Sequence, residues 1–438
     1  MLSEHRISVF GFIGTKPSLE SNVDPWRYLG MSVLSDNIQT LLASEALDLL
    51  TQLMRIDSQT KNIAGVNQAQ DLLIDFLAPL GFQHERLPHH RGDYGDLLVL
   101  KREVSPKAKT LTFIFHVDTV LPPRSGEPFY LCPMTKNLIG QGVADCKGGI
   151  VIALLAIKKF LETSKDQLNL QVISSPNEEV GSVGFLDICS DLGKQSDYLL
   201  GFEPSLPDGS VISSRNGNRW YNIEVEGRSA HAGRANGEEI NAAHDLALKI
   251  AEILKLKDKF PKAKLNIGSL EGGTGQYNIV CGQASAKLDT RFEDHSTRNQ
   301  LHHHIAKILE TPMVRDRDGE PAKCRFHIDD DCPPMEFKPP VKPLADHFVE
   351  LIRSIEKRDI EHRHATGAAD INHMSYPHNL CLDGLGAVGG RLHREDEYIE
   401  VDSLMTRSQG VAQLVHLIEN GTLSADERKH SNLGVHLC

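Results

Sequence analysis

One segment, between positions 111 and 149, constrains the fold more than any other. The apolar run Leu111–Phe115 predicts a buried strand, which ends at His116 and Asp118. Side chains two positions apart in a strand point to the same face, so the imidazole and the carboxylate are expected side by side. A glycine-rich turn then carries Asp145, and the missing glycine side chains let the backbone bring this carboxylate close to the histidine.

The pair formed by His116 and Asp118 is typical of a metal-binding histidine. In such a pair one ring nitrogen binds the metal while the other donates its proton to the carboxylate. A single His-x-Asp at a strand end is more often an ordinary buried feature than a ligand pair. The prediction of a metal site therefore depends on further ligands elsewhere in the chain.

Length and charge limit the class of protein. At 438 residues the chain is too long for one ordinary core, so two domains are expected. The formal net charge of −12 argues against nucleic acid or an anionic membrane as the main partner, because both attract basic surfaces. The strongly apolar segment Ile150–Leu161 predicts a helix that is far too short to span a membrane.

The cysteines and the first residues bear on the compartment. Eight cysteines are scattered without a Cys-x-x-Cys pair, which is typical of reduced thiols and predicts a cytoplasmic protein. The apolar stretch Ile7–Ile13 is too weak for a secretion signal and has no small-residue cleavage site close behind it. Residues 1–40 are predicted to be an N-terminal extension outside the fold, or the result of a start assigned ahead of Met31.

Strands and helices alternate along the first half of the chain, which predicts an α/β domain with a mainly parallel central sheet. The expected strands are Asp96–Leu100, Leu111–Phe115, Leu168–Ser174 and Tyr198–Phe202, and the expected helices are Ala43–Met54, Ala69–Leu80 and Ile150–Leu161.

The pattern changes near Arg215 and changes back near Pro333. Strands are expected at Trp220–Glu226, Leu265–Leu270, Tyr277–Arg291 and Cys324–Ile328, with helices at Asn241–Leu256 and Thr297–Leu309. They predict a small α+β domain with helices on one face of an antiparallel sheet. The chain is thus divided into a catalytic domain of residues 41–214 and 333–421, an inserted domain of residues 215–332, and a C-terminal tail of residues 422–438.

Three later segments place acidic and imidazole side chains where a metal site could use them. Glu178 and Glu179 follow one expected strand, and neighbours in an extended chain point to opposite sides, so one can bind metal while the other faces the substrate. Glu203 ends the next strand, and His393 supplies a second imidazole far downstream. Ligands of α/β sheets gather outside the carboxyl ends of the strands, where these residues are expected.

Five blocks of this sequence resemble, in order and spacing, the superfamily of co-catalytic zinc carboxypeptidases and aminoacylases. The blocks are His116-Val117-Asp118, Gly142–Gly149, Asn177-Glu178-Glu179, Phe202-Glu203-Pro204, and His393 with Glu397-Tyr398. The superfamily includes glutamate carboxypeptidase, acetylornithine deacetylase and succinyl-diaminopimelate desuccinylase. The segments Arg215-Asn216-Gly217 and Gly227–Gly233 look closest to the glutamate carboxypeptidase branch. The resemblance covers roughly Ala43–Leu417 and implies a zinc-exopeptidase-like catalytic domain with an inserted lid or dimerisation domain.

The resemblance also implies two zinc ions per chain, with Co²⁺ as a substitute. One ion would take His116, Asp145 and Glu203, and the other would take Asp145, Glu179 and His393, so that Asp145 bridges the two. Nitrogen and carboxylate ligands suit zinc, and three protein ligands for each ion leave a position open for water.

Catalytic roles follow from the same resemblance. Glu178 would act as the general base, taking a proton from the attacking water and returning it to the leaving amine. Asp118 would orient His116. His231, in the inserted domain, is similar to a histidine that reaches the active site of a partner subunit to stabilise the developing oxyanion, which implies a homodimer formed through this domain.

The implied reaction is hydrolysis of an amide bond in a small substrate that bears a free carboxylate. Asn278 and Arg291 resemble residues that bind this carboxylate, although Arg291 suits a structural ion pair with Asp289 equally well. A glutamate carboxypeptidase-like exopeptidase is the first expectation. An N-acyl-amino-acid deacylase such as acetylornithine deacetylase is the alternative, and an inactive binding or scaffold protein is a third reading, disfavoured because no ligand is missing.

Two departures from the superfamily pattern stand out. Cys146 occupies a position where relatives more often have Met, and it is expected to serve only packing. Arg391 places a cation two residues before His393, where it could recognise an acidic side chain of the substrate or pair with Glu395 or Asp396.

Rival chemistries lack their residues. The run His302-His303-His304 is not a metal site, because consecutive helical side chains fan around the axis. Gly140 and Gly142 do not complete a dinucleotide-binding fingerprint, because Asp145 takes the place of its third glycine. No Gly-x-Ser-x-Gly element is present, which disfavours a serine hydrolase.

Overall fold

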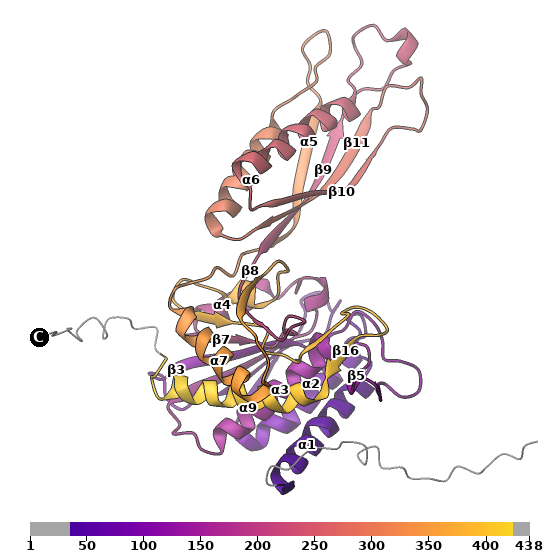
Figure 1. The fold of residues 1–438 in the computed structure, drawn as a ribbon. Helices are drawn as coiled ribbons and strands as arrows, with labels where there is room; N and C mark the ends of the chain where they lie inside the picture. Colours follow the sequence, from indigo (N-terminus) through magenta and orange to yellow (C-terminus); the bar gives the residue numbers. More distant parts are fainter. Residues whose placement is uncertain (1–35, 424–438) are drawn as a thin grey trace, which may run out of the picture. The chain divides into compact units, whose positions relative to one another are not determined.

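The computed structural model describes residues 36–423. The predictions for the first thirty residues and for most of the C-terminal tail lie outside the described residues. The predicted fold class is confirmed: a mixed α/β domain with a mainly parallel central sheet carries an inserted α+β domain (Figure 1).

Six strands form the central sheet in the order β1-β2-β6-β3-β7-β14. The strands β6, β3, β7 and β14 are parallel to one another, while β1 and β2 form an antiparallel edge. Their bounds are β1 (Gln83–Leu87), β2 (Leu97–Arg102), β3 (Lys109–His116), β6 (Leu168–Ser175), β7 (Tyr198–Gly201) and β14 (Leu380–Leu382). The short strands β1 and β14 could not be predicted from the sequence, because each has too few residues to show a periodic pattern.

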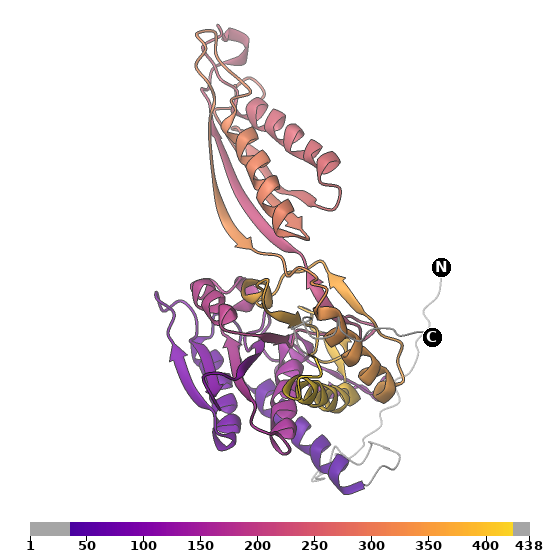
Figure 2. The same ribbon diagram turned by 90° about the vertical axis from the view of Figure 1, so that its left-hand side faces the viewer.

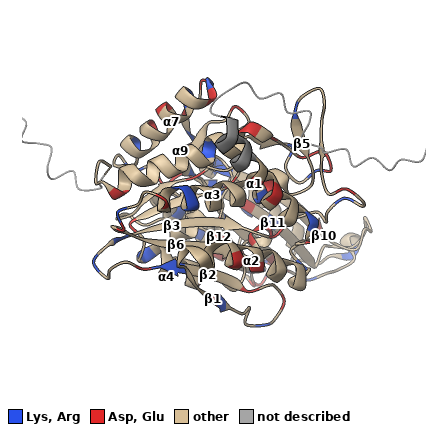
Figure 3. Cartoon of the chain, turned by 90° about the horizontal axis from the view of Figure 1, so that it is seen from below, with Lys and Arg blue, Asp and Glu red and all other residues tan. Residues whose placement is uncertain are grey.

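Helices cover both faces of this sheet. On one face α3 (Gly149–Leu161) packs against α9 (Val401–Glu419), and α9 packs against α7 (Val341–Glu356). On the other face α4 (Leu186–Lys194) and α8 (Ile371–Met374) share an apolar core with β2, β3, β6 and β7. Two further helices precede the sheet in the chain, α1 (Asp36–Arg55) and α2 (Ile63–Leu77). Figure 3 shows charged residues of both signs on α7, while β6 carries none.

Smaller elements connect the ends of the sheet. A second sheet has the order β15-β16-β5-β4, and two strands, β8 and β13, form a parallel pair. The bounds are β4 (Tyr130–Leu131), β5 (Asn137–Ile139), β8 (Val211–Arg215), β13 (His362–Ala365), β15 (Gly389–Gly390) and β16 (Tyr398–Glu400). Because β16 pairs with β5, the segment that follows His393 lies beside the glycine-rich turn that carries Asp145.

The inserted domain has the predicted architecture. Its sheet has the order β10-β11-β9-β12 and is antiparallel throughout, and its two helices lie on one face (Figures 1 and 2). The elements are β9 (Gly217–Glu226), α5 (Ala242–Lys259), β10 (Lys264–Gly272), β11 (Gln283–Phe292), α6 (His295–Glu310) and β12 (Lys323–Cys332). Asn241 and Asp294 cap the two helices by accepting a hydrogen bond from the backbone three residues on.

One expected boundary in the inserted domain is wrong. The strand expected over Tyr277–Arg291 begins only at Gln283, and the residues before it form turns and bends. Gly282 marks the change, since its backbone lies so close to Ser229 that a side chain would not fit there. The alternation of exposed and buried side chains therefore starts at Gln283, one residue after Gly282, and its buried positions include alanines and a leucine that face the core of the domain.

The chain enters and leaves the inserted domain at one place. The backbones of Arg215 and Met335 pair through two hydrogen bonds of 2.9 and 3.1 Å. The buried side-chain amide of Asn372 donates to the carbonyl oxygens of both connections, at 3.0 Å to Asn216 and 2.8 Å to Pro333. The two connections are thus tied together by one side chain.

The helices within residues 36–423 are all too short or too polar to cross a lipid bilayer.

Candidate metal centre

Three of the five predicted ligands, His116, Glu179 and Glu203, lie at the carboxyl ends of three neighbouring parallel strands. His116 is the last residue of β3, and in the sheet it pairs with Ser175 at the end of β6. Glu178 and Glu179 follow β6, and Glu203 follows β7 by two residues. The parallel arrangement explains why residues so far apart in the sequence converge, since parallel strands all end at the same edge.

Asp145 lies between the two histidines. Its Oδ1 atom is 2.9 Å from Nε2 of His116, and its Oδ2 atom is 3.2 Å from Nε2 of His393. The residue is 7% exposed, so neither oxygen depends on bulk water for its partner. One carboxylate oxygen is therefore directed toward each half of the centre, which is the arrangement a bridging ligand needs.

Each half is completed by a glutamate. Glu203 Oε1 lies 3.7 Å from Nε2 of His116, and Glu179 Oε2 lies 3.0 Å from Nε2 of His393. The ligand atoms of His116, Asp145 and Glu179 all lie within 4.8 Å of one another. The structure thus brings together all five residues that the sequence singled out as ligands.

Asp118 holds several of these groups in place without facing the centre. Its Oδ1 atom lies 3.3 Å from Nδ1 of His116, on the side of the ring away from Asp145. It also accepts the backbone N–H groups of Glu178 and Glu179, at 3.1 and 3.3 Å. The hydroxyl of Thr60 donates to it at 2.8 Å. Asp118 is fully buried, and it orients both a histidine and the glutamate pair.

The extended backbone predicted for the glutamate pair is wrong. Glu178 and Glu179 are instead the first two residues of a short 3₁₀ helix, Glu178–Val180. Consecutive residues of such a turn still point in different directions, because each step rotates the chain by about a third of a turn. The side chain of Glu179 reaches His393, whereas the pKa of Glu178 is affected first by burial and then by the charges of Glu203 and His116.

The charges of the cluster suit bound divalent cations. Burial raises the pKa of Glu203 to about 8, and burial together with the Glu203 charge raises the pKa of Glu178 well above its usual range. Hydrogen bonds to Asp145 and Glu179 raise the pKa of His393 to about 10. These pKa shifts show that the carboxylates of the cluster lie close together with too little positive charge to balance them. The nitrogen and oxygen donors of the cluster are ligands that zinc accepts.

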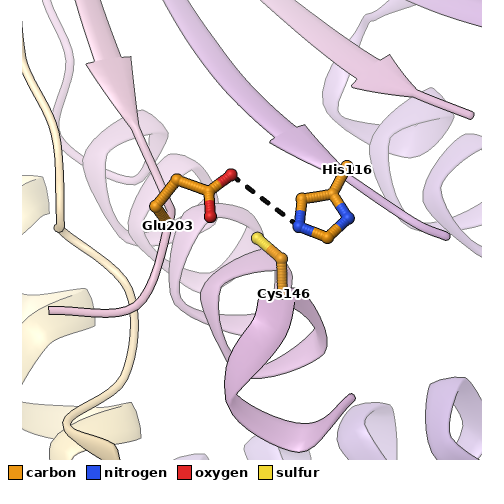
Figure 4. Close-up of side chains that lie close together, drawn as sticks. All are labelled: His116, Cys146 and Glu203. Carbon is orange, nitrogen blue, oxygen red and sulfur yellow. Dashed lines mark ion pairs between the residues drawn. The ribbon is translucent and has the colours of Figure 1, made fainter. Parts of the chain in front are cut away.

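Cys146 lies beside the same centre (Figure 4). Its sulfur and the ligand atoms of His116 and Glu203 lie within 4.8 Å of one another. The fully buried thiol donates a hydrogen bond to the carbonyl oxygen of Phe202 at 3.1 Å, and burial raises its pKa well above the usual value. A neutral, hydrogen-bonded thiol agrees with the predicted packing role.

The remaining predicted site residues make other contacts. His231 and Asn278 are exposed, and their side chains approach one another at 3.5 Å. Arg291 pairs with Asp289 at 3.0 Å, as the structural reading of this residue anticipated. Arg391 donates to Asp396 at 2.7 Å, which is one of its two predicted partners. Their roles toward a substrate remain predictions.

Two contributors to the centre had no predicted role. Thr60 supplies the hydroxyl that Asp118 accepts, and nothing in the local sequence distinguishes it from other threonines of a loop. Glu397 was part of a recognised block, but its carboxylate accepts three backbone N–H groups of the turn around Asp145. The only sign of a role in the sequence was the position of this glutamate just before a short strand. The sequence could not show which backbone N–H groups its carboxylate would contact.

The chain is similar in sequence to known peptidases and desuccinylases. Residues 213–317 match the family model described as a peptidase dimerisation domain. The succinyl-diaminopimelate desuccinylase of a Psychrobacter species is 25% identical over 395 residues, covering 84% of this chain and 94% of the relative. Carboxypeptidase G2 of a Pseudomonas species is 24% identical over 371 residues, covering 84% of this chain and 87% of the relative.

Solved structures agree on the fold. The crystal structure of aminopeptidase PepT from Bacillus cereus superposes with a TM-score of 0.67 at 20% identity, covering 85% of this chain and 98% of that one. The YXEP protein of Bacillus subtilis, described as a dinuclear metal-binding peptidase of the M20 family, gives 0.59 at 14% identity, covering 87% and 99%. Together with the sequence relatives, they confirm the predicted resemblance of the chain to the M20 metallohydrolases, the superfamily of co-catalytic zinc carboxypeptidases and aminoacylases.

Proposed function

We propose that the protein hydrolyses an amide bond in a small, carboxylate-bearing substrate at a centre of two zinc ions. The observation that carries the proposal is the position of Asp145, with one oxygen toward His116 and the other toward His393. His116, Asp145 and Glu203 would hold one ion, and Asp145, Glu179 and His393 would hold the other. When bound, two such ions supply Lewis acidity for the carbonyl group and for the attacking water.

The chain's own residues supply the proton transfers. Glu178 is buried among the ligands but is not needed to bind metal, and it takes the proton of the attacking water and delivers it to the leaving amine. Asp118 fixes the backbone of Glu178 through the 3.1 Å hydrogen bond, so the base and the histidine share one anchor. The tetrahedral oxyanion needs a donor from elsewhere, and His231 of a second subunit is the group we assign to it.

A substitution of the base tests this mechanism. Glu178→Ala should keep both metal ions and lower kcat by about 10²- to 10⁴-fold, the usual contribution of general acid–base catalysis. Metal content by mass spectrometry and turnover should be measured on the same sample, with Glu162→Ala, a substitution at an exposed glutamate, as the control. Near-normal turnover in Glu178→Ala would contradict the assigned role.

The substrate is proposed by class. The first candidate is a peptide with a C-terminal glutamate, and the similarity to a carboxypeptidase supports removal of a C-terminal residue. The second is an N-acyl amino acid, and the similarity to a succinyl-diaminopimelate desuccinylase favours an N-succinyl group. The two differ in which side of the amide is recognised. A panel of C-terminal glutamate dipeptides and N-acetyl and N-succinyl amino acids, assayed with the zinc-loaded protein by amine release, separates them.

Assembly and compartment are part of the same proposal. The dimerisation domain supports a homodimer, and the net charge of −12 supports a protein without a nucleic-acid or membrane partner. Seven cysteines lie among the described residues and all are free thiols, which supports a reducing compartment such as the cytoplasm. Zinc is the proposed native metal, and Co²⁺ should replace it.

A further inference from the structure

Glu397 holds the turn that carries Asp145. Its Oε2 atom accepts the backbone N–H of Gly142 at 2.8 Å, and its Oε1 atom accepts those of Ala144 and Asp145 at 2.7 and 2.9 Å. The residue is only 2% exposed, and its backbone carbonyl accepts the N–H of Gly140 at 2.9 Å. One buried residue therefore accepts hydrogen bonds from four backbone N–H groups between Gly140 and Asp145, in a turn more than 250 positions earlier in the chain.

The turn needs such a partner because it is not a regular element. Gly142 has a φ of +74°, and its neighbours donate their N–H groups inward toward one point. Without an acceptor there, three buried N–H groups would lack a hydrogen bond, and the turn would have other conformations of similar energy. The conformation of the turn decides where the two oxygens of Asp145 point.

We propose that Glu397 is a positioning residue of the metal centre: its carboxylate fixes the turn so that Asp145 directs one oxygen to each of the two histidines. The inference rests on the proposed function, since it gives Asp145 the bridging role. His393 lies four residues before Glu397 on the same segment, so this short segment supplies a ligand and also orients the bridge. The two metal positions are thereby coupled through the protein before any ion binds.

The chain offers a matched control at Glu419. This buried carboxylate also accepts several donors, namely the hydroxyl of Ser164 at 2.7 Å and the backbone N–H groups of Lys165 and Gln167 at 3.0 and 3.3 Å. It holds the loop before Leu168, the first residue of β6, whereas the metal centre lies beyond the other end of that strand. Glu419→Gln thus disturbs a similar contact away from the metal ligands.

The experiment compares Glu397→Gln with Glu419→Gln in the full-length protein. Both variants should lower Tm, because both lose a buried carboxylate acceptor. Only Glu397→Gln should weaken zinc binding, by about 10- to 100-fold as for other residues that orient ligands, measured by competition with a chromophoric chelator. Only Glu397→Gln should also change the visible absorption spectrum of the Co²⁺-substituted protein.

The outcomes are separable. If Glu397→Gln binds two ions with wild-type affinity and spectrum while Tm falls as in Glu419→Gln, the residue is merely structural and the inference is overturned. If the wild-type protein itself binds fewer than two ions, the proposed function fails instead.

A measurement on the wild-type chain covers the case in which Glu397→Gln does not fold. Hydrogen exchange of a peptide spanning Gly142–Asp145 should show protection in the zinc-free protein, since Glu397 orders the turn in advance. Protection that appears only after zinc is added would overturn the inference equally.

Discussion

At the scale of single residues, two buried carboxylates, Asp118 and Glu397, position most of the groups that face the candidate metal positions. Asp118 contacts a ligand histidine and the backbone of both neighbouring glutamates, and Glu397 contacts the turn of the bridging aspartate. Each is a buried carboxylate whose acceptor capacity of about four hydrogen bonds is largely used. The histidines and carboxylates that face the metal positions are therefore supported by carboxylates that do not.

Replacing Asp118 with Asn should expose this dependence. The amide keeps one acceptor oxygen but turns the other position into a donor, which faces the N–H group of either Glu178 or Glu179, since each of them bonds to a different oxygen of Asp118. We expect kcat/KM to fall by about 10- to 100-fold with a small loss of zinc affinity, since both the ligand His116 and the base lose their anchor.

Thr60→Val is the matched control for this substitution, because it removes the 2.8 Å hydroxyl contact to Asp118 and a longer one of 3.4 Å to the carbonyl oxygen of Thr119, and leaves the other contacts of Asp118 in place. It should cost less activity than Asp118→Asn. Equal kcat/KM for Asp118→Asn and the wild-type protein would show that the orienting contacts do not matter.

The candidate ligands could be named from the sequence because five blocks resemble the superfamily in order and spacing. His116, Glu179 and Glu203 also stand at or just after the ends of apolar strands, and the topology rule for α/β sheets predicts that such strand ends meet at one edge. The contacts of Glu397 and Thr60 could not be predicted, since each reaches across loops of irregular conformation. Arg291 was ambiguous from the start, and its contact with Asp289 shows why a charge pair on one strand cannot be interpreted without coordinates.

At the scale of elements, the start of α3 packs tightly against the end of β7. A Cβ atom on Gly149 would lie 2.0 Å from the carbonyl oxygen of Phe202, which directly precedes Glu203. The helix that follows Asp145 and the strand end that precedes Glu203 are therefore in backbone contact. This close approach explains how two ligands from separate segments come within reach of one histidine.

Gly149→Ala should break that approach. The new methyl group meets backbone, which cannot rotate away, so we expect a loss of about 1–3 kcal/mol in the free energy of unfolding, measured with urea. Gly367→Ala is the control, because no atom lies within 4 Å of the position its Cβ would take. It should change the free energy of unfolding by less than about 0.5 kcal/mol. A stable Gly149→Ala variant with full zinc content would show that helix and strand can separate without cost.

Long elements were predictable and short ones were not. The helix expected at Ile150–Leu161 is α3, Gly149–Leu161, and the strand expected at Leu168–Ser174 is β6, Leu168–Ser175. Their apolar runs are long enough for the period to show. By contrast, β14 has three residues, and its place at the sheet edge depends on pairing with β7, which no local pattern encodes.

At the scale of the whole molecule, the homodimer remains a prediction that a mixing experiment can test. A His231→Ala subunit keeps its own Glu178, and a Glu178→Ala subunit keeps His231. If His231 acts on the partner's site, each heterodimer regains one complete site, and an equal mixture should recover about a quarter of wild-type activity by random pairing.

The mixing must include a step that lets subunits exchange, with size-exclusion chromatography to verify dimers. Each variant kept alone through the same step serves as the control. No recovery in mixtures that contain heterodimers would place His231 outside the shared site.

The tie that Asn372 makes between the two connections also bears on the history of the protein. Asn218 pairs with Cys332 across β9 and β12, so residues close to the two ends of the inserted domain are neighbours. Because its ends are adjacent, the inserted domain affects the central sheet in the same way as a long loop. The entropy cost of closing a loop grows only slowly with its length. A domain attached in this way can be acquired, exchanged or lost as a cassette while the strands that carry the metal ligands keep their order.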